Sequence, residues 1–137
     1  MIPKSLALGA GIIVLLAACS STKPQTTARP NIVVTYSVLG SVVSDLVGDS
    51  ATVTVLIPDG QDPHEFQPSA RDIETINNAS IVVSNGFDFE EGLLEVLATA
   101  ESNGVPQFRV GNSITSRIVE GESADPHLWL SPTNFVQ

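Results

Sequence analysis

The sequence predicts an α/β fold in which a mostly parallel sheet is flanked by helices. Short runs rich in valine and isoleucine alternate along the chain with segments whose apolar residues recur at helical spacing. Each strand-like run is followed by a helix-like segment before the next run, which is the kind of connection that parallel strands need. In such folds ligands bind at the carboxyl ends of the strands. The 137 residues are enough for one domain.

The first two predicted strands are expected to be connected by one helix. The β-branched run NIVVTY predicts a buried strand at 31–36. Ser37 is expected to act as the N-cap of the helix that follows, and Gly48 as its C-cap. A second strand is predicted at 51–57, where the turn sequence Pro58-Asp59-Gly60 marks its end.

A second helix and a third strand are expected next. Ser69 and Asp72 have the spacing of a capping box, so a helix should open there and continue through Ala79. The apolar run at 80–84 predicts the third strand, which Asn85-Gly86 ends.

The last elements are less regular. A third helix is expected to fade near Ser102, and its first turn should hold acidic residues that suit the helix dipole: Asp88, Glu90 and Glu91. A fourth strand is predicted at 107–110, and a short apolar element at 128–130. Pro132 has the position of the first residue of another helix. Because domains rarely finish where an element begins, we interpret 31–137 as the N-terminal part of a longer protein; the alternative is a terminus that frays after Pro132.

The beginning of the chain has the pattern of an export signal. Lys4 precedes an apolar run that is shorter than the roughly 20 residues of a membrane span, so residues 1–18 are predicted to be a secretory signal peptide. Small residues precede Cys19 and resemble a bacterial lipobox, in which the cysteine is acylated and becomes the mature N-terminus. A plain signal peptide with a stray cysteine is the alternative. Residues 19–30 are expected to form the lipidated cysteine and a flexible tether.

Composition excludes several functions. Six basic residues stand against fifteen acidic ones, for a net charge of −9, which argues against binding to nucleic acid or docking on anionic lipid through a basic patch. A single cysteine excludes an internal disulfide framework and a multi-cysteine zinc site. No HExxH motif or nucleophile elbow is present, so the chain is not expected to be an enzyme.

The chemistry is concentrated in the two histidines, His64 and His127. Both occur in the tripeptide Asp-Pro-His, and each follows the end of a strand or a loop. Proline stiffens the backbone, and a stiff backbone holds an imidazole in one direction, as a metal ligand needs. Asp62 and Asp125 are candidate acceptors for the ring N–H groups, or they only form turns.

Two imidazoles cannot complete a tetrahedral zinc site, because two more ligands are needed. Glu65 is a weak candidate for a third ligand, since it is adjacent to His64 and would tend to point elsewhere. The alternative interpretation is that both tripeptides only form turns and that the histidines bind no metal.

Together these strings resemble a known family, the TroA-like metal-binding lipoproteins of bacterial zinc and manganese ABC importers. The resemblance extends from Asn31 to Gln137 and rests mainly on DPHEFQPS at 62–69 and DPHLWLSP at 125–132. The strand 32–36, the string at 56–58 and Ser84-Asn85-Gly86 before the acidic segment also match. The lipobox fits the anchoring that this family usually has.

The resemblance implies a two-lobed protein with an α/β domain on each side of a metal cleft and a long rigid helix between the lobes. His64 and His127 match the two ligands that the N-terminal lobe contributes, and the other two ligands would come from a second lobe beyond Gln137. Asn85 and Trp129 match positions near the cleft that are not ligands. The implied function is capture of a divalent metal outside the cytoplasmic membrane, at the cell surface or in the periplasm, and delivery to an ABC permease.

The choice of metal depends on ligands that this sequence does not contain. The segment 111–124 lacks the histidine-rich loop of some zinc-binding members, which removes one indicator of zinc without supporting manganese. Zinc accepts four nitrogen and oxygen ligands, whereas manganese prefers more oxygen. Zn²⁺ is therefore favoured as the transported cargo, with Mn²⁺ as the alternative.

Three other functions remain open on the sequence. A zinc metallohydrolase would use the same histidines with Glu65 as the general base. A surface adhesin-type lipoprotein would use the histidines only in turns. A third alternative is a solute-binding protein for another cargo, such as a metal chelate, which differs from the implied function only in what is bound.

Overall fold

A computed structural model describes residues 28–114 and 124–135. These residues form a four-stranded parallel sheet with helices on both faces, so the predicted α/β class is confirmed. The predicted signal peptide, Cys19 and most of the predicted tether lie outside the described residues. None of the described helices has both the length and the apolar character that crossing a membrane requires.

The sheet has the strand order β2-β1-β3-β4, and every neighbouring pair is parallel. Its strands are β1 (Asn31–Tyr36), β2 (Thr52–Ile57), β3 (Ile81–Ser84) and β4 (Gln107–Arg109). The order places β1 between β2 and β3, so the chain changes direction across the sheet after β2. Because all strands are parallel, the loops that follow them leave from the same edge of the sheet.

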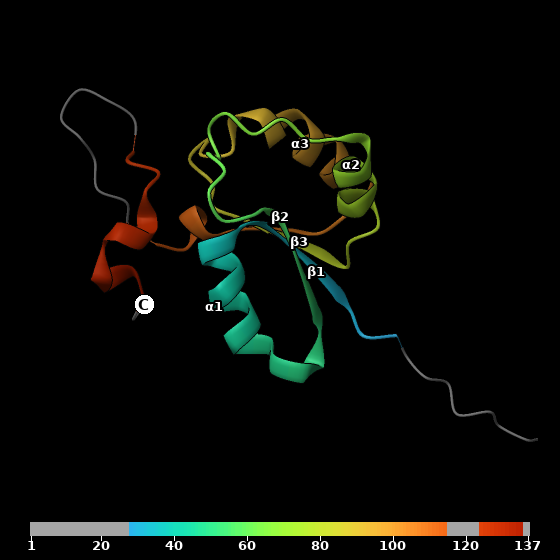
Figure 1. The fold of residues 1–137 in the computed structure, drawn as a ribbon, viewed down its shortest axis with the longest axis horizontal. Coiled ribbons are helices and arrows are strands. Elements are labelled where there is room, and N and C mark those ends of the chain that lie inside the picture. Colours follow the sequence, from blue (N-terminus) through green and yellow to red (C-terminus); the bar gives the residue numbers. More distant parts are fainter. Residues whose placement is uncertain (1–27, 115–123, 136–137) are drawn as a thin grey trace, which may run out of the picture.

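The helices are divided between the two faces of this sheet (Figure 1). Helix α1 (Ser37–Val47) covers one face, next to β1 and β2. Helices α2 (Ala70–Asn77) and α3 (Leu94–Ser102) lie together on the other face. Five short 3₁₀ segments complete the described structure: η1 (Gly48–Ser50), η2 (Glu91–Leu93), η3 (Val110–Asn112), η4 (Leu128–Leu130) and η5 (Pro132–Phe135).

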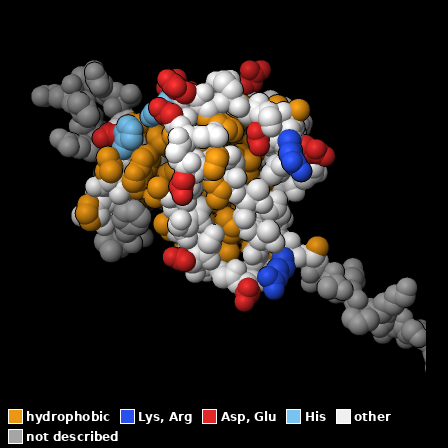
Figure 2. All heavy atoms as spheres, in the orientation of Figure 1, with side chains coloured by type: hydrophobic (Ala, Val, Ile, Leu, Met, Phe, Trp, Pro, Cys, Tyr) orange, Lys and Arg blue, Asp and Glu red, His pale blue; other side chains and the backbone are white. Residues whose placement is uncertain are grey.

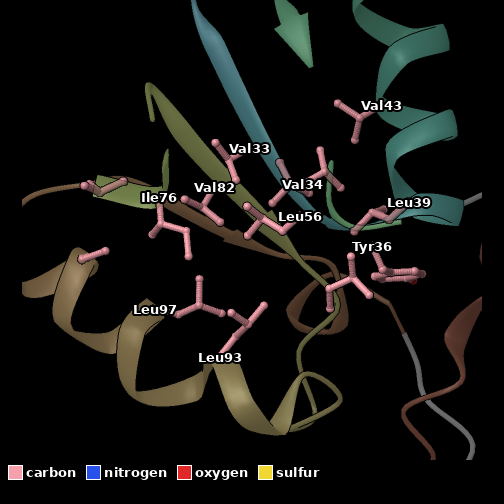
Figure 3. Packing of buried hydrophobic residues seen from close by; sticks show 14 of the residues in the cluster. Val33, Val34, Tyr36, Leu39, Val43, Leu56, Ile76, Val82, Leu93 and Leu97 are labelled. Atoms are coloured by element: carbon pink, nitrogen blue, oxygen red, sulfur yellow. The ribbon is translucent and has the colours of Figure 1, made fainter. Parts of the chain in front are cut away.

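The hydrophobic core lies on both faces of the sheet. Val33 and Val34 are adjacent in β1 and both are 0% exposed, as expected where each face of a strand is covered. Figure 3 shows Leu97 reaching the sheet from α3 and Leu39 reaching it from α1. Leu93, which precedes α3, is also 0% exposed.

The strand predictions are confirmed within one residue at each end, and the capping box is confirmed. The Ser69 hydroxyl accepts a hydrogen bond from the Asp72 N–H, and the Asp72 carboxylate accepts one from the Ser69 N–H. Helix α2 ends at Asn77, two residues before the predicted Ala79. Gly48 ends α1 with a positive φ of 49° and donates its N–H to the Ser44 carbonyl, as the prediction of a C-cap requires.

The prediction that Ser37 caps α1 is wrong. Strand β1 runs directly into α1, so Ser37 is already the first helical residue and the extended Tyr36 occupies the N-cap position. No side chain caps this end of the helix. The side chain of Tyr36 instead points toward a buried polar group, described below, because its ring lies at the end of a core strand.

The predicted start of the third helix is also wrong. The chain first makes a left-handed turn at Phe87 and Asp88, whose φ angles are 53° and 55°. Glu90 is then buried, and only Glu91 lies in a first helical turn, that of η2. Helix α3 begins later, at Leu94. Pro132 opens the 3₁₀ segment η5 rather than an α-helix.

Candidate functional site

Both histidines lie at the carboxyl edge of the sheet, although 63 positions separate them in the sequence. The loop that follows β2 carries His64, and the segment 124–135 carries His127. The turn that follows β3 places Phe89 against both histidine rings, and Tyr36 ends the central strand β1. The rule that parallel strands present their ligands at this edge therefore predicts where the two tripeptides meet.

The two imidazole rings lie beside each other. Their centroids are 5.6 Å apart, and the ring planes are inclined by 55°. About a third of the His64 side chain and two fifths of the His127 side chain remain exposed. Both rings line a shallow cavity of about 340 Å³, whose walls also include Tyr36, Phe89 and Trp129. Figure 2 shows the two histidines together at one end of the molecule, bordered by hydrophobic and acidic side chains.

The two Asp-Pro-His turns hold their histidines differently. In both turns the aspartate accepts a hydrogen bond from the histidine N–H: Asp62 Oδ1 at 2.9 Å and Asp125 Oδ1 at 3.0 Å. Asp125 Oδ1 also lies 2.8 Å from Nδ1 of His127, whereas the carboxylate near Nδ1 of His64 is that of Glu91, at 3.6 Å. An Nδ1–H that donates to a carboxylate fixes the tautomer and leaves the Nε2 lone pair available to a ligand.

Aromatic rings form an apolar floor under the histidines. Phe89 packs edge-on against both imidazoles, with centroid distances of 4.9 Å to His64 and 5.8 Å to His127. Trp129 lies 5.5 Å from the His127 ring and 5.2 Å from the Tyr36 ring, and it packs against the core. These contacts exclude water from one side of the rings and restrict how they rotate.

A buried polar network lies beneath this floor. Glu90 is 1% exposed and accepts hydrogen bonds from the Thr35 hydroxyl at 2.5 Å and from the Asn85 N–H at 2.8 Å. Burial raises the pKa of Glu90, although the hydrogen bonds to its carboxylate act in the opposite direction. The Tyr36 hydroxyl donates to Asn85 Oδ1 at 3.0 Å. Burial, and then the charge of Glu90, raise the pKa of Tyr36 far above its ordinary value, so this phenol remains a hydrogen-bond donor.

The described residues supply two metal-ligand candidates and no complete site. Across 28–114 and 124–135, no group of three or more histidine, cysteine, aspartate or glutamate side chains is arranged to hold a metal ion. Glu65, the weak candidate for a third ligand, is exposed. The arrangement therefore offers two imidazoles packed on apolar side chains and open on the side away from Phe89.

Sequence reasoning missed three residues that shape this site: Phe89, Glu90 and Glu91. The acidic pair was interpreted as the first turn of a helix, which is the ordinary place for such residues. One sequence feature did point to a turn in place of a helix start. Asn85-Gly86 is a typical turn sequence, and it lies only a few residues before Glu90 and Glu91. Nothing local indicates that Glu90 meets Thr35, which is 55 positions away.

Comparison with known proteins gives a consistent result. The family model for the zinc-uptake complex component A, periplasmic (ZnuA), matches residues 32–137. The iron ABC transporter substrate-binding lipoprotein MtsA of Streptococcus pyogenes is 34% identical over 96% of this chain and 46% of its own length. The manganese ABC transporter substrate-binding lipoprotein PsaA of Streptococcus pneumoniae is 29% identical over 90% of this chain and 43% of its own length.

A solved structure agrees with these relatives. Zn(II)-bound AdcA from Streptococcus pneumoniae superimposes with a TM-score of 0.68 and 29% identity, over 78% of this chain and 23% of that one. The chain thus spans less than half the length of each of these proteins. The two curated relatives are named as substrate-binding proteins, and their names give different metals.

Proposed function

The chain belongs to the family of periplasmic zinc-uptake components (ZnuA), and from this we propose that it captures a divalent transition metal and delivers it to an ABC importer. Zn²⁺ is the proposed cargo and Mn²⁺ the alternative. The partner is a permease in the cytoplasmic membrane. The site of action is outside that membrane, with the protein anchored by a lipid on Cys19.

The observation that carries this proposal is the juxtaposition of the two imidazoles. Two imidazoles bound to one tetrahedral zinc, with Zn–N distances of about 2.0–2.1 Å, have ring centroids roughly 5 Å apart. The centroids of His64 and His127 are 5.6 Å apart. The rings therefore need little movement to share one ion, and this supports their assignment as ligands.

The proposed roles follow from what holds each ring. His127 binds the metal through Nε2, because Asp125 occupies its Nδ1 at 2.8 Å. His64 is proposed to bind through the same atom, with the Glu91 carboxylate 3.6 Å from its Nδ1, beyond hydrogen-bond distance. Asp125 orients both the ring and the backbone of its histidine, whereas Asp62 holds the backbone N–H of His64.

The remaining ligands are proposed to lie beyond Gln137. Residues 31–137 would then form the N-terminal metal-binding lobe, which accords with the chain's coverage of less than half of its relatives. In this organisation 1–18 is the signal peptide and 19–30 carries the lipid and the tether. Reading the coding sequence past Gln137 tests this: a further domain with a histidine or glutamate and a later acidic residue is expected.

Catalysis is not supported by any of the named relatives, which are substrate-binding proteins. Glu65, which a metallohydrolase would need as a base beside the metal, is exposed. The adhesin-type alternative has no observation in its favour either.

Metal titration tests the proposal. In the protein that includes any sequence beyond Gln137, His64→Ala and His127→Ala should each weaken Zn²⁺ binding by orders of magnitude, measured by competition with a chromogenic chelator. Glu95→Gln, which changes an exposed residue of α3, is the control and should leave the affinity unchanged. Titration of the same proteins with Mn²⁺ ranks the two metals. Wild-type affinity in both histidine variants would disprove the function.

A further inference from the structure

We infer that Asn85 is a positioning residue for metal binding. Its side-chain amide, which also accepts a hydrogen bond from the Tyr36 hydroxyl, fixes the peptide that joins Pro126 to His127 and thereby sets the direction of the His127 ring. This inference rests on the proposed function, since it concerns how a proposed ligand is held.

The first step is the burial of the Asn85 amide. Asn85 follows β3 directly and is 1% exposed. Nδ2 donates to the Pro126 carbonyl at 2.8 Å and to the Gly86 carbonyl at 3.0 Å. Oδ1 accepts from the Tyr36 hydroxyl at 3.0 Å. Both ends of the amide are thus paired, as a buried asparagine requires.

The second step is that this arrangement has one orientation. Rotating the amide by half a turn would place Oδ1 against two carbonyl oxygens and Nδ2 against the hydroxyl that donates to it. A lone pair facing another lone pair in a buried position is strongly unfavourable. The Pro126 and Gly86 carbonyl oxygens, which can only accept, therefore determine which end of Asn85 faces them, and the Tyr36 hydroxyl pairs with the other end.

The third step connects the amide to the imidazole. The Pro126 carbonyl and the His127 N–H belong to the same peptide unit, and both are held. The carbonyl accepts from Asn85 Nδ2 and from the Leu128 N–H, each at 2.8 Å, and the N–H donates to Asp125 Oδ1. Asp125 Oδ1 also reaches Nδ1 of the ring. With the peptide plane fixed at one end and the ring at the other, the half-exposed imidazole points in a defined direction. In the metal-free protein this organisation lowers the entropy that metal binding would otherwise have to remove.

The test compares Asn85→Asp with a matched control, using Zn²⁺ alone as the probe. Asn85→Asp keeps the shape of the side chain but removes the donor to Pro126, and we expect a loss of about tenfold in zinc affinity, the range found for residues that orient metal ligands. The added negative charge would by itself attract a cation, so a loss of affinity would come from the lost donor and the displaced Pro126 carbonyl and not from weaker attraction of the ion. Asn78→Asp is the control, because Asn78 also donates Nδ2 to a carbonyl, that of Glu74, but lies exposed at the end of α2.

A second variant covers the case in which Asn85→Asp fails to fold. Tyr36→Phe keeps the ring contacts with Phe89 and Trp129 and removes only the hydroxyl that donates to Asn85 Oδ1 and holds the amide in place. Loss of this one hydrogen bond should weaken zinc binding by about threefold.

Two readouts separate positioning from a general loss of structure. In ¹⁵N spectra of histidine-labelled, metal-free protein, the ring signals of His64 and His127 are assigned as those that disappear in His64→Ala and His127→Ala. Asn85→Asp and Tyr36→Phe should shift and broaden those of His127 and leave those of His64 in place. In a double-mutant cycle the Asn85→Asp loss should persist with His64→Ala and vanish with His127→Ala.

The outcomes distinguish this inference from the function it rests on. If both histidine variants bind zinc like wild type, the proposed function fails whatever Asn85 does. If the histidines matter but Asn85→Asp and Tyr36→Phe bind zinc like Asn78→Asp, only the positioning role is overturned. Equal shifts of both histidine spectra would also overturn it, because they would indicate a structural effect on the whole site.

Discussion

Glu90 places a carboxylate where almost no water reaches it. The group is 1% exposed, and its hydrogen bonds come from the strand β1, through Thr35, and from the turn after β3, through Asn85. An ionised carboxylate in such a position loses its hydration, and hydrogen bonds return only part of that energy. Burial accordingly has the largest effect on the pKa of Glu90 and raises it above the ordinary value of 4.5.

This shift predicts how stability depends on pH. The folded protein binds the Glu90 proton more tightly than the unfolded chain, so the contribution of this group is complete below about pH 4.5 and is lost as the pH rises through the folded-state pKa. We expect the free energy of unfolding of wild type to fall relative to Glu90→Gln as the pH increases from about 4 upward. Urea unfolding at a series of pH values measures this difference. Parallel pH profiles of the two proteins would show that Glu90 titrates normally.

A second residue-scale prediction separates the two aspartates. Asp125 contacts both the backbone N–H and the ring of its histidine, whereas Asp62 accepts from the backbone N–H of His64. Asp125→Asn should therefore weaken zinc binding by about tenfold, and Asp62→Asn by clearly less. Each variant removes one negative charge from the same edge of the sheet, so each controls for the charge effect of the other. Equal losses in chelator competition would contradict the ring contact of Asp125.

At the scale of elements, α1 packs closely on the sheet through Gly40. An ideal Cβ at this position would lie 2.5 Å from Cγ2 of Val55 in β2. Overpacking of this kind costs about 1–3 kcal/mol, which is more than the roughly 1 kcal/mol that alanine gains over glycine in a helix. We expect Gly40→Ala to destabilise the protein by about 1 kcal/mol. Ser41→Ala, at the next and exposed position, should be neutral or slightly stabilising. Thermal unfolding of both variants checks the opposite signs.

Strands were predictable at this scale, and helix starts were not. Val33, Val34 and Val82 belong to runs whose apolar character reflects burial on both faces, a signal that local sequence carries. The start of α1 depends instead on β1 continuing into it without a linker, which makes Tyr36 rather than Ser37 the N-cap. The start of α3 depends on the partner of Glu90, which is far away in the sequence.

The same distinction applies to the candidate site. His64 and His127 could be singled out because the tripeptide is repeated and because parallel strands share a carboxyl edge. Asn85 was connected to the cleft only through the family resemblance, and its hydrogen bonds to Tyr36 and Pro126 have no local sequence signature. Pairwise contacts between distant segments are the part that pattern reasoning cannot supply.

At the scale of the whole molecule, the described residues present the two proposed ligands, His64 and His127, at an open edge of the sheet. The rings of Phe89, Tyr36 and Trp129 close the site from below, toward the core. An ion held there by His64 and His127 alone would keep the rest of its coordination sphere in water. Such an ion would exchange quickly, because water ligands resist neither dissociation nor competing chelators.

The last prediction concerns what this part of the protein can do alone. The free energy of Zn²⁺ binding to a four-ligand site is about 10–16 kcal/mol in favour of the complex. A site with half of the ligands should therefore lose about 5 kcal/mol or more of this binding free energy. Since 1.4 kcal/mol corresponds to a factor of ten, residues 19–137 alone should bind Zn²⁺ more than about a thousandfold more weakly than a chain extended by the proposed second lobe. Isothermal titration measures the weak affinity and chelator competition the strong one. Tight, histidine-dependent binding by the shorter chain would instead require further ligands within residues 19–137, and the proposed division into two lobes would then lose its functional reason.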